Sequence, residues 1–146
     1  MIVGPVATRL GDSAIIKDGV AERIYFTRVP QNEGYPLLQI NQISGRSLDE
    51  LGPPEDDATT IQIDVWAEDT PQDGGQSSYD FLKAMGDEIR KLLEGVSWEI
   101  GGFSVQSATL ERDNFTAVPR TQGSTDWLRR RSMDFRLLHT NNVARS

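Results

Sequence analysis

Two aspartates and one histidine are the side chains in this sequence that most resemble catalytic groups. Asp64 and Asp134 lie on separate strand-like segments, and paired carboxylates act as general acid and base when their surroundings separate their pKa values. His139 is the single histidine, and imidazole is the usual base for a nucleophile near neutral pH. No Gly-x-Ser-x-Gly elbow accompanies it. We therefore predict that both aspartates are exposed-face residues, that His139 is structural or solvated, and that the chain has no catalytic residue.

Metal and cofactor sites are not supported by the motifs present. The acidic run Glu55, Asp56 and Asp57 lacks the Asp-x-Asp-x-Asp-Gly spacing that wraps calcium. The sequence contains no cysteine, which excludes thiolate metal sites, thiol nucleophiles and disulfides. The glycine pairs at 74–75 and 101–102 are not followed by the lysine of a phosphate-binding loop. We expect no metal and no cofactor.

Charge is distributed unevenly along a chain whose net charge is −7. Residues 49–99 carry fourteen Asp and Glu against three Lys and Arg, whereas residues 112–146 carry three acids and seven Arg. The run Arg129 to Arg131 is the one basic cluster, but side chains alternate along a strand, so only Arg129 and Arg131 share a face. We interpret this cluster as a salt-bridging or interface strand and not as a phosphate track.

The elements that position these residues have clear periodicity. Residues 59–67 alternate between Ile61, Ile63 and Val65 on one face and polar side chains on the other, which predicts a half-buried strand. Residues 77–94 place apolar side chains at helical spacing up to Gly95, with Ser77 as the expected N-cap. Gly86 lies inside this helix and indicates close packing there.

Weaker patterns complete a single domain over residues 1–146. We predict a short or broken N-terminal helix, interrupted at Gly11-Asp12, and further strands at 23–26, 37–44, 96–100, 103–112 and 127–139. Mobile loops are expected at about 45–57 and 113–126. One helix packed on a mainly antiparallel sheet of about four to six strands defines an α+β fold. Neither a membrane-spanning run nor a secretory signal is expected. The lack of cysteine suits a reducing cytoplasm.

Several short motifs, in this order, resemble the tail-terminator or tail-completion proteins of long-tailed bacteriophages. The resemblance covers about residues 20–139, and the order of the motifs is more specific than any one of them. The most recognisable is the strand Ile61-Gln62-Ile63-Asp64-Val65-Trp66-Ala67. The others are Val20 to Tyr25, Pro30-Gln31, Tyr35-Pro36, Gln42 to Gly45, the helix at 77–94, and Arg131-Ser132-Met133-Asp134-Phe135-Arg136.

The resemblance implies a structural virion protein of the tail or neck, assembled in the host cytoplasm and not an enzyme. Members of this family form a homo-oligomeric ring, usually a hexamer, that caps the tail tube, ends its polymerisation and joins it to the head. The implied partners are the tail tube protein, a head-tail connector protein and further copies of the chain. DNA only passes through the lumen, which acids of 49–57 or 68–73 would line, and no membrane is involved.

Interface candidates follow from the loops and the basic strand, because exposed loops commonly order on binding. They are Leu51, Glu55, Asp56, Asp57, Val118, Arg120, Arg129 and Arg131. Two alternatives stay open at this point. One is a head-side connector or stopper ring of the phage neck, and the other is a small hydrolase that uses Asp64, Asp134 or His139.

Overall fold

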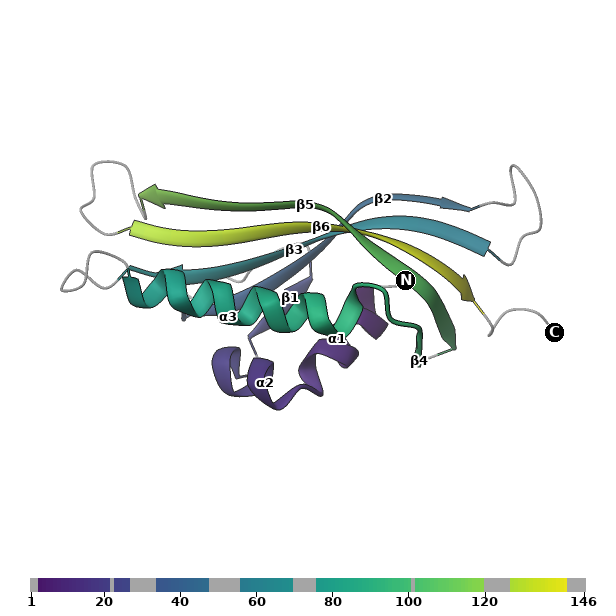
Figure 1. The fold of residues 1–146 in the computed structure, drawn as a ribbon, viewed down its shortest axis with the longest axis horizontal. Helices are drawn as coiled ribbons and strands as arrows, with labels where there is room; N and C mark the ends of the chain where they lie inside the picture. Colours follow the sequence, from purple (N-terminus) through teal and green to yellow (C-terminus); the bar gives the residue numbers. More distant parts are fainter. Residues whose placement is uncertain are drawn as a thin grey trace.

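The described part of the chain folds as one curled, six-stranded sheet with three helices on one side (Figure 1). The computed structural model describes residues 3–21, 23–26, 34–47, 56–69, 76–100, 102–119 and 127–141. The strand order is β1-β2-β3-β6-β5-β4, and all neighbours are antiparallel except the β1–β2 pair. This arrangement confirms the predicted α+β class.

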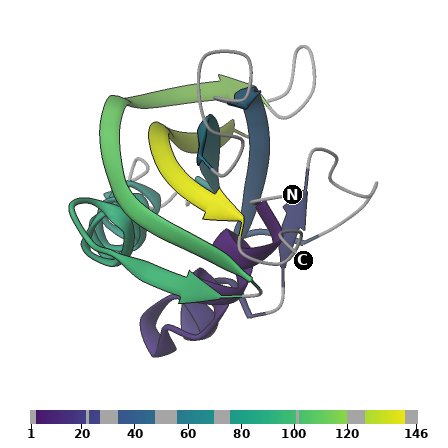
Figure 2. The same cartoon turned by 90° about the vertical axis from the view of Figure 1, so that its right-hand side faces the viewer.

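The helices and strands follow one another with most strands grouped around one long helix. In chain order they are α1 (Val3–Gly11), α2 (Ala14–Val20), β1 (Ile24–Phe26), β2 (Leu37–Ser47), β3 (Asp56–Glu68), α3 (Gln76–Leu93), β4 (Trp98–Ile100), β5 (Phe103–Pro119) and β6 (Trp127–Asn141). The strands β3, β5 and β6 form the long central part of the sheet, which curls so that β1 and β4 approach the same helix, α1 (Figure 2).

The predicted break in the N-terminal helix is confirmed at Gly11 and Asp12. There α1 ends, and α2 begins after Ser13, whose hydroxyl accepts a hydrogen bond from the Ile16 amide as an N-cap does. Ser13 Oγ also donates to Glu88 Oε2 of α3 at 3.0 Å. The break therefore turns the chain and ties the turn to the main helix.

The main helix occupies nearly the predicted range. α3 ends at Leu93, and Gly95 has a φ of 69°, the left-handed conformation that glycine adopts readily at a helix C-terminus. The predicted N-cap at Ser77 is wrong, because α3 begins one residue earlier at Gln76. Ser77 lies inside the first turn, where Gln76 Nε2 donates to Asp80 Oδ1 at 2.9 Å.

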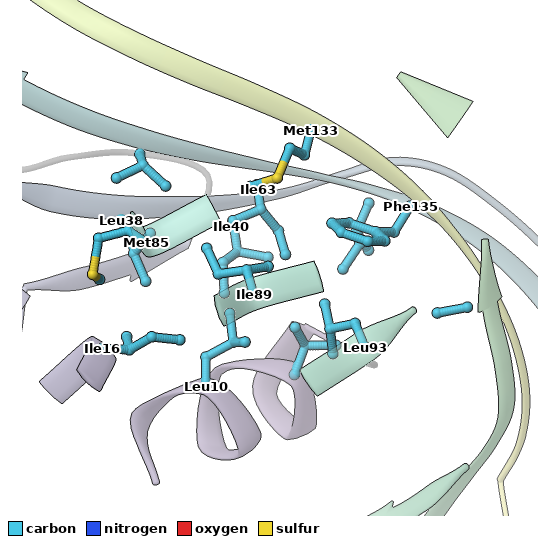
Figure 3. Close-up of a cluster of buried hydrophobic side chains, with 14 of the residues drawn as sticks. Leu10, Ile16, Leu38, Ile40, Ile63, Met85, Ile89, Leu93, Met133 and Phe135 are labelled. Atoms are coloured by element: carbon cyan, nitrogen blue, oxygen red, sulfur yellow. The ribbon is translucent and has the colours of Figure 1, made fainter. Parts of the chain in front are cut away.

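The core lies between the helices and one face of the sheet (Figure 3). Apolar side chains at helical spacing on α3 meet alternating side chains of β2, β3 and β6, as the two periodicities require. Burial of this apolar surface is the main stabilising contribution to the fold. Residues that are at most 2% exposed include Leu10, Ile16, Leu38, Ile40, Ile63, Met85, Ile89, Leu93, Met133 and Phe135.

The predicted loops at 45–57 and 113–126 were too wide. β2 continues to Ser47 and β3 begins at Asp56, because Ser47 pairs with Asp57 and β6 extends alongside β3 as far as the Asp56–Thr140 pair. β5 continues to Pro119, paired throughout with β6. Backbone pairing with a neighbouring strand thus outweighs the poor strand propensity of the acidic and polar residues in these segments.

Candidate assembly surfaces

Arg131 joins α3 to the sheet through one buried guanidinium. Its side chain is 4% exposed, and it binds the Asp113 carboxylate of β5 through two parallel contacts, Nε to Oδ1 at 2.9 Å and Nη2 to Oδ2 at 2.7 Å. Nη1 donates to the Lys83 carbonyl at 3.0 Å and to Asp87 Oδ1 at 3.2 Å. Two-pronged pairing of this kind fixes both distance and orientation, so Arg131 sets how the helix lies on β5 and β6.

Gly86 makes room for that guanidinium. A Cβ at position 86 would overlap the Arg131 side chain, which confirms the close packing predicted for this glycine. The Arg131 guanidinium also lies 4.9 Å from the centre of the Phe115 ring, and Phe115 in turn contacts Tyr79 with 5.1 Å between ring centres. The arginine is therefore enclosed by a glycine, an aromatic ring and two carboxylates.

The other two arginines of the basic cluster also have partners within the chain. Arg129 Nε is paired with Asp69 Oδ1, and Asp69 accepts a second hydrogen bond from Ser78 Oγ at 2.7 Å. Arg130 points to the opposite face, where its guanidinium lies 5.2 Å from the centre of the Trp66 ring. The interpretation of the cluster as a salt-bridging strand is confirmed for Arg129 and Arg131.

Polar side chains gather on the face of the sheet opposite the helices, called the open face from here on. Asp64, Ser132 and Asp134 lie on it, because Ile63 and Met133 beside them face the core. The prediction that Asp64 is exposed is wrong, since its relative exposure is 4%. Burial raises the pKa of Asp64. A hydrogen bond from Ser132 and the nearby positive charge of Arg130 act to lower this pKa, but burial has the larger effect. Asp64 lies on a central strand between Gln39 of β2 and Ser132 of β6, a position that periodicity within one strand does not reveal.

His139 is structural, as the sequence suggested. It is 3% exposed, its Nε2 is hydrogen-bonded to Thr59 Oγ1 at 2.9 Å, and its ring meets Phe103 edge-on. Within the described ranges, no three His, Cys, Asp or Glu side chains are grouped as metal ligands would be. Nor is any helix in the described part long and apolar enough to cross a membrane.

The structure describes only part of the predicted interface set. Leu51, Glu55 and Arg120 lie outside the described residues, and Asp56 and Asp57 begin β3, with only their backbone described. Val118 is half-buried near the end of β5, close to the Arg129 pair. Arg131 is buried within the protomer and acts there as an intramolecular tie.

The tertiary structure also brings exposed apolar side chains together in two places that the sequence reasoning missed. Tyr79, Phe115 and Trp127 are 41%, 41% and 42% exposed at the end of the molecule where α3 and β6 begin and β5 ends (Figure 1). We call this set the aromatic end. Tyr79 lies outside the row of apolar residues by which α3 faces the core. An aromatic residue at such a position was the sequence signal for an exposed ring.

The second place is a groove between α1 and the two edges of the curled sheet, called the edge groove. Its cavity has a volume of about 560 Å³. The lining is mainly apolar and consists of Gly4, Pro5, Ala7, Thr8, Ile24, Phe26, Ile100 and Phe103. Phe26 on its rim is 48% exposed. The groove exists only because the sheet curls and brings β1 and β4 to the same helix (Figure 2).

Comparison with known proteins places this architecture in a family. A family model described as "Tail completion protein gp17" matches residues 4–140. The chain belongs to the tail completion protein gp17 family. No curated protein matches the sequence. Among solved structures, a chain from the "Virion of native gene transfer agent (GTA) particle" is similar in fold, with a TM-score of 0.62 at 16% identity over 92% of this chain and 91% of that one.

Membership of the tail completion family confirms the resemblance seen in the short motifs. The matched range contains all the described strands and helices apart from their outermost residues. Proteins of this family are structural tail components of phage-like virions and not enzymes. Asp64, Asp134 and His139 are therefore structural groups of a virion protein, and the hydrolase alternative is removed.

Proposed function

We propose that this tail completion protein caps the tail tube as a ring of identical copies, ends its polymerisation and joins the tail to the head. The observation that carries the proposal is the family match over residues 4–140. The proposed ring is a hexamer in the virion neck, with the tail tube protein on one side, a head-tail connector protein on the other and DNA passing through the lumen.

The physical properties of the described surface support self-assembly. A head-to-tail contact uses two different surfaces of each copy and closes into a ring when the rotation per copy divides a full turn. The chain offers such unlike surfaces, because it has exposed aromatic rings at the aromatic end and an apolar hollow at the edge groove.

The first experiment measures the mass of the purified protein by light scattering and images it in negative stain with and without tail tubes. We expect rings, either in solution or on tube ends, and tubes that stop growing once capped. A protein that stays monomeric and ignores tube ends would contradict the proposal. Rings that bind the head connector and leave tube ends bare would instead establish a head-side stopper.

Three substitutions at the predicted interface residues test where the partners bind. Leu51→Asp, Val118→Asp and Arg120→Glu each place a charge of the wrong kind at a position proposed to contact a partner. We expect at least one of them to abolish ring formation or tube capping while leaving the thermal unfolding of the protomer unchanged. Unchanged assembly in all three would remove these residues from the interface.

A further inference from the structure

The aromatic end and the edge groove lie at opposite ends of the same long strand. Phe115 of the aromatic end is near the C-terminal end of β5, and Phe103 of the edge groove is its first residue. Figure 1 shows α3 and β6 beginning at one end of the molecule and β4 lying at the other. A surface with exposed aromatic rings thus lies towards the C-terminal end of β5, and an apolar groove lies at the N-terminal end of the same strand.

We propose that the aromatic end of one copy docks into the edge groove of the next copy. This inference rests on the proposed ring and specifies which two surfaces meet in it. A heterologous contact needs two different surfaces that fit each other, and these two differ in both shape and position. In this arrangement a second copy of the chain supplies the partner of each surface, and every copy in a closed ring uses both.

The chemistry of the two surfaces is complementary. Tyr79, Phe115 and Trp127 leave large areas of ring exposed, and aromatic anchors in apolar pockets dominate the energetics of most interfaces. The edge groove offers mainly apolar lining and enough room for an aromatic side chain, with Phe26 on the rim.

Rigidity at the aromatic end favours docking. Phe115 is held between the Arg131 guanidinium and the Tyr79 ring, and the Trp127 carbonyl accepts a hydrogen bond from the Asp69 amide at 3.0 Å. A surface that is already ordered loses little conformational entropy on binding. Val118 and Arg129, predicted as interface residues from the sequence, lie in the same region.

The test uses one variant for each surface. Trp127→Ser removes an aromatic anchor, and Thr8→Trp fills the edge groove from its exposed rim. Each is expected to weaken assembly by roughly tenfold or more, as loss of a central anchor does, so that the variant stays monomeric at concentrations where the natural chain forms rings. The matched control is Ile15→Ser, which removes a side chain that is 54% exposed on α2 and should leave assembly unchanged.

Mixing the two variants gives the sharpest outcome. The Trp127→Ser copy retains its groove and the Thr8→Trp copy retains its aromatic end, so the mixture has one intact contact and should stop at a heterodimer. Normal assembly of Thr8→Trp alone would overturn the inference, since aromatic ends would then meet each other or another surface. If Trp127→Ser forms rings that do not bind tube ends, the aromatic end contacts the tube protein, and the inference is overturned.

A second measurement does not depend on destabilising substitutions. Because the chain has no cysteine, the pair Thr8→Cys and Ala117→Cys can be joined between copies by a short thiol cross-linker. We expect a ladder up to the full ring, and none for the control pair Thr8→Cys and Lys91→Cys. Rings that form without a Thr8–Ala117 cross-link would overturn this contact but leave the proposed ring intact. A natural chain that forms no ring, alone or on tubes, would overturn both.

Discussion

Arg131 connects α3, β5 and β6 through a single side chain. Its guanidinium meets Asp113, Asp87 and a backbone carbonyl of α3 while only 4% of the side chain is exposed. An ion pair with one buried member contributes little net free energy of folding relative to an apolar replacement of both partners, but loss of one partner leaves the other charge unpaired and partly desolvated. The residue therefore determines the packing of the helix more than it adds to total stability.

Replacing Arg131 with Met should destabilise the protomer by about 2 to 3 kcal/mol, below the usual loss for a fully buried pair because Asp87 is half exposed. The measurement is chemical denaturation followed by circular dichroism. The control is Arg136→Met, at an exposed position on the same strand, which should change the free energy of unfolding by less than about 0.5 kcal/mol. Equal effects at the two positions would show that the Arg131 network does not hold the helix.

Asp64 provides a prediction about pH. Burial raises the pKa of Asp64 in the folded state above the usual value of an aspartate in the unfolded chain, so the folded protein binds a proton more readily than the unfolded chain does. Stability therefore increases as the pH falls through the raised pKa, and the penalty of the buried charge is fully present above it. This direction is opposite to that of a salt-bridged carboxylate.

Asp64→Asn should accordingly stabilise the protein at pH 7 by on the order of 1 kcal/mol, the size of the desolvation cost of a buried polar group. The advantage over the natural chain should shrink as the pH is lowered towards 4, and thermal unfolding across this range measures it. Glu99→Gln, which removes an exposed charge from β4, is the control. A variant whose advantage does not change with pH would contradict the assignment to Asp64.

At the scale of elements, the contact between α3 and the sheet depends on the absence of a side chain at Gly86. Alanine normally favours a helix over glycine by about 1 kcal/mol. Here the added methyl group would overlap Arg131, and overpacking of this kind costs about 1 to 3 kcal/mol. We expect Gly86→Ala to lower the free energy of unfolding despite its better helix propensity.

Gly4→Ala is the matched control, because a Cβ at Gly4 of α1 meets nothing within 4 Å. It should be neutral or slightly stabilising. In the Arg131→Met background the loss caused by Gly86→Ala should become smaller, since the overlapping group is gone, and a double-mutant cycle measures this coupling. If the effects of the two substitutions were additive, overlap with Arg131 would not be the cause of the destabilisation by Gly86→Ala.

At the scale of the whole molecule, charge is expected to contribute to assembly. The triple variant Glu55→Lys, Asp56→Lys and Asp57→Lys reverses part of the acidic middle, and Arg120→Glu reverses part of the basic last third. We expect each variant to weaken ring formation, and their mixture to recover part of it if the two regions meet across the interface. Light scattering at low and high salt measures the effect, which should diminish as salt screens the charges. If neither charge reversal changes ring formation, the contact between copies does not depend on these charges, and the apolar surfaces remain as the proposed contact.

The sequence by itself determined the local elements and the family. The helical spacing in residues 77–94 predicted α3 to within one residue at each end, and the alternation in residues 59–67 predicted β3 except for its first three residues and its last one. Both patterns are clear because one face of each element is buried and the pattern must follow the period of the backbone. The order of short motifs led to the tail completion family, whose model matches residues 4–140. The loop boundaries were too wide because propensity ignores the pairing that a neighbouring strand supplies.

Only the tertiary structure decided how residues far apart in the chain combine. The burial of Asp64, the Arg131 network and the two apolar surfaces each depend on which strands lie side by side and how far the sheet curls. These are non-local properties: Phe26 of β1 and Ile100 of β4 share a groove because the two strands approach the same helix, and no periodicity within either strand encodes that approach. The periodicity of the sequence thus determines which face of each element is buried. The packing of the elements determines which surfaces stay exposed for a partner to bind.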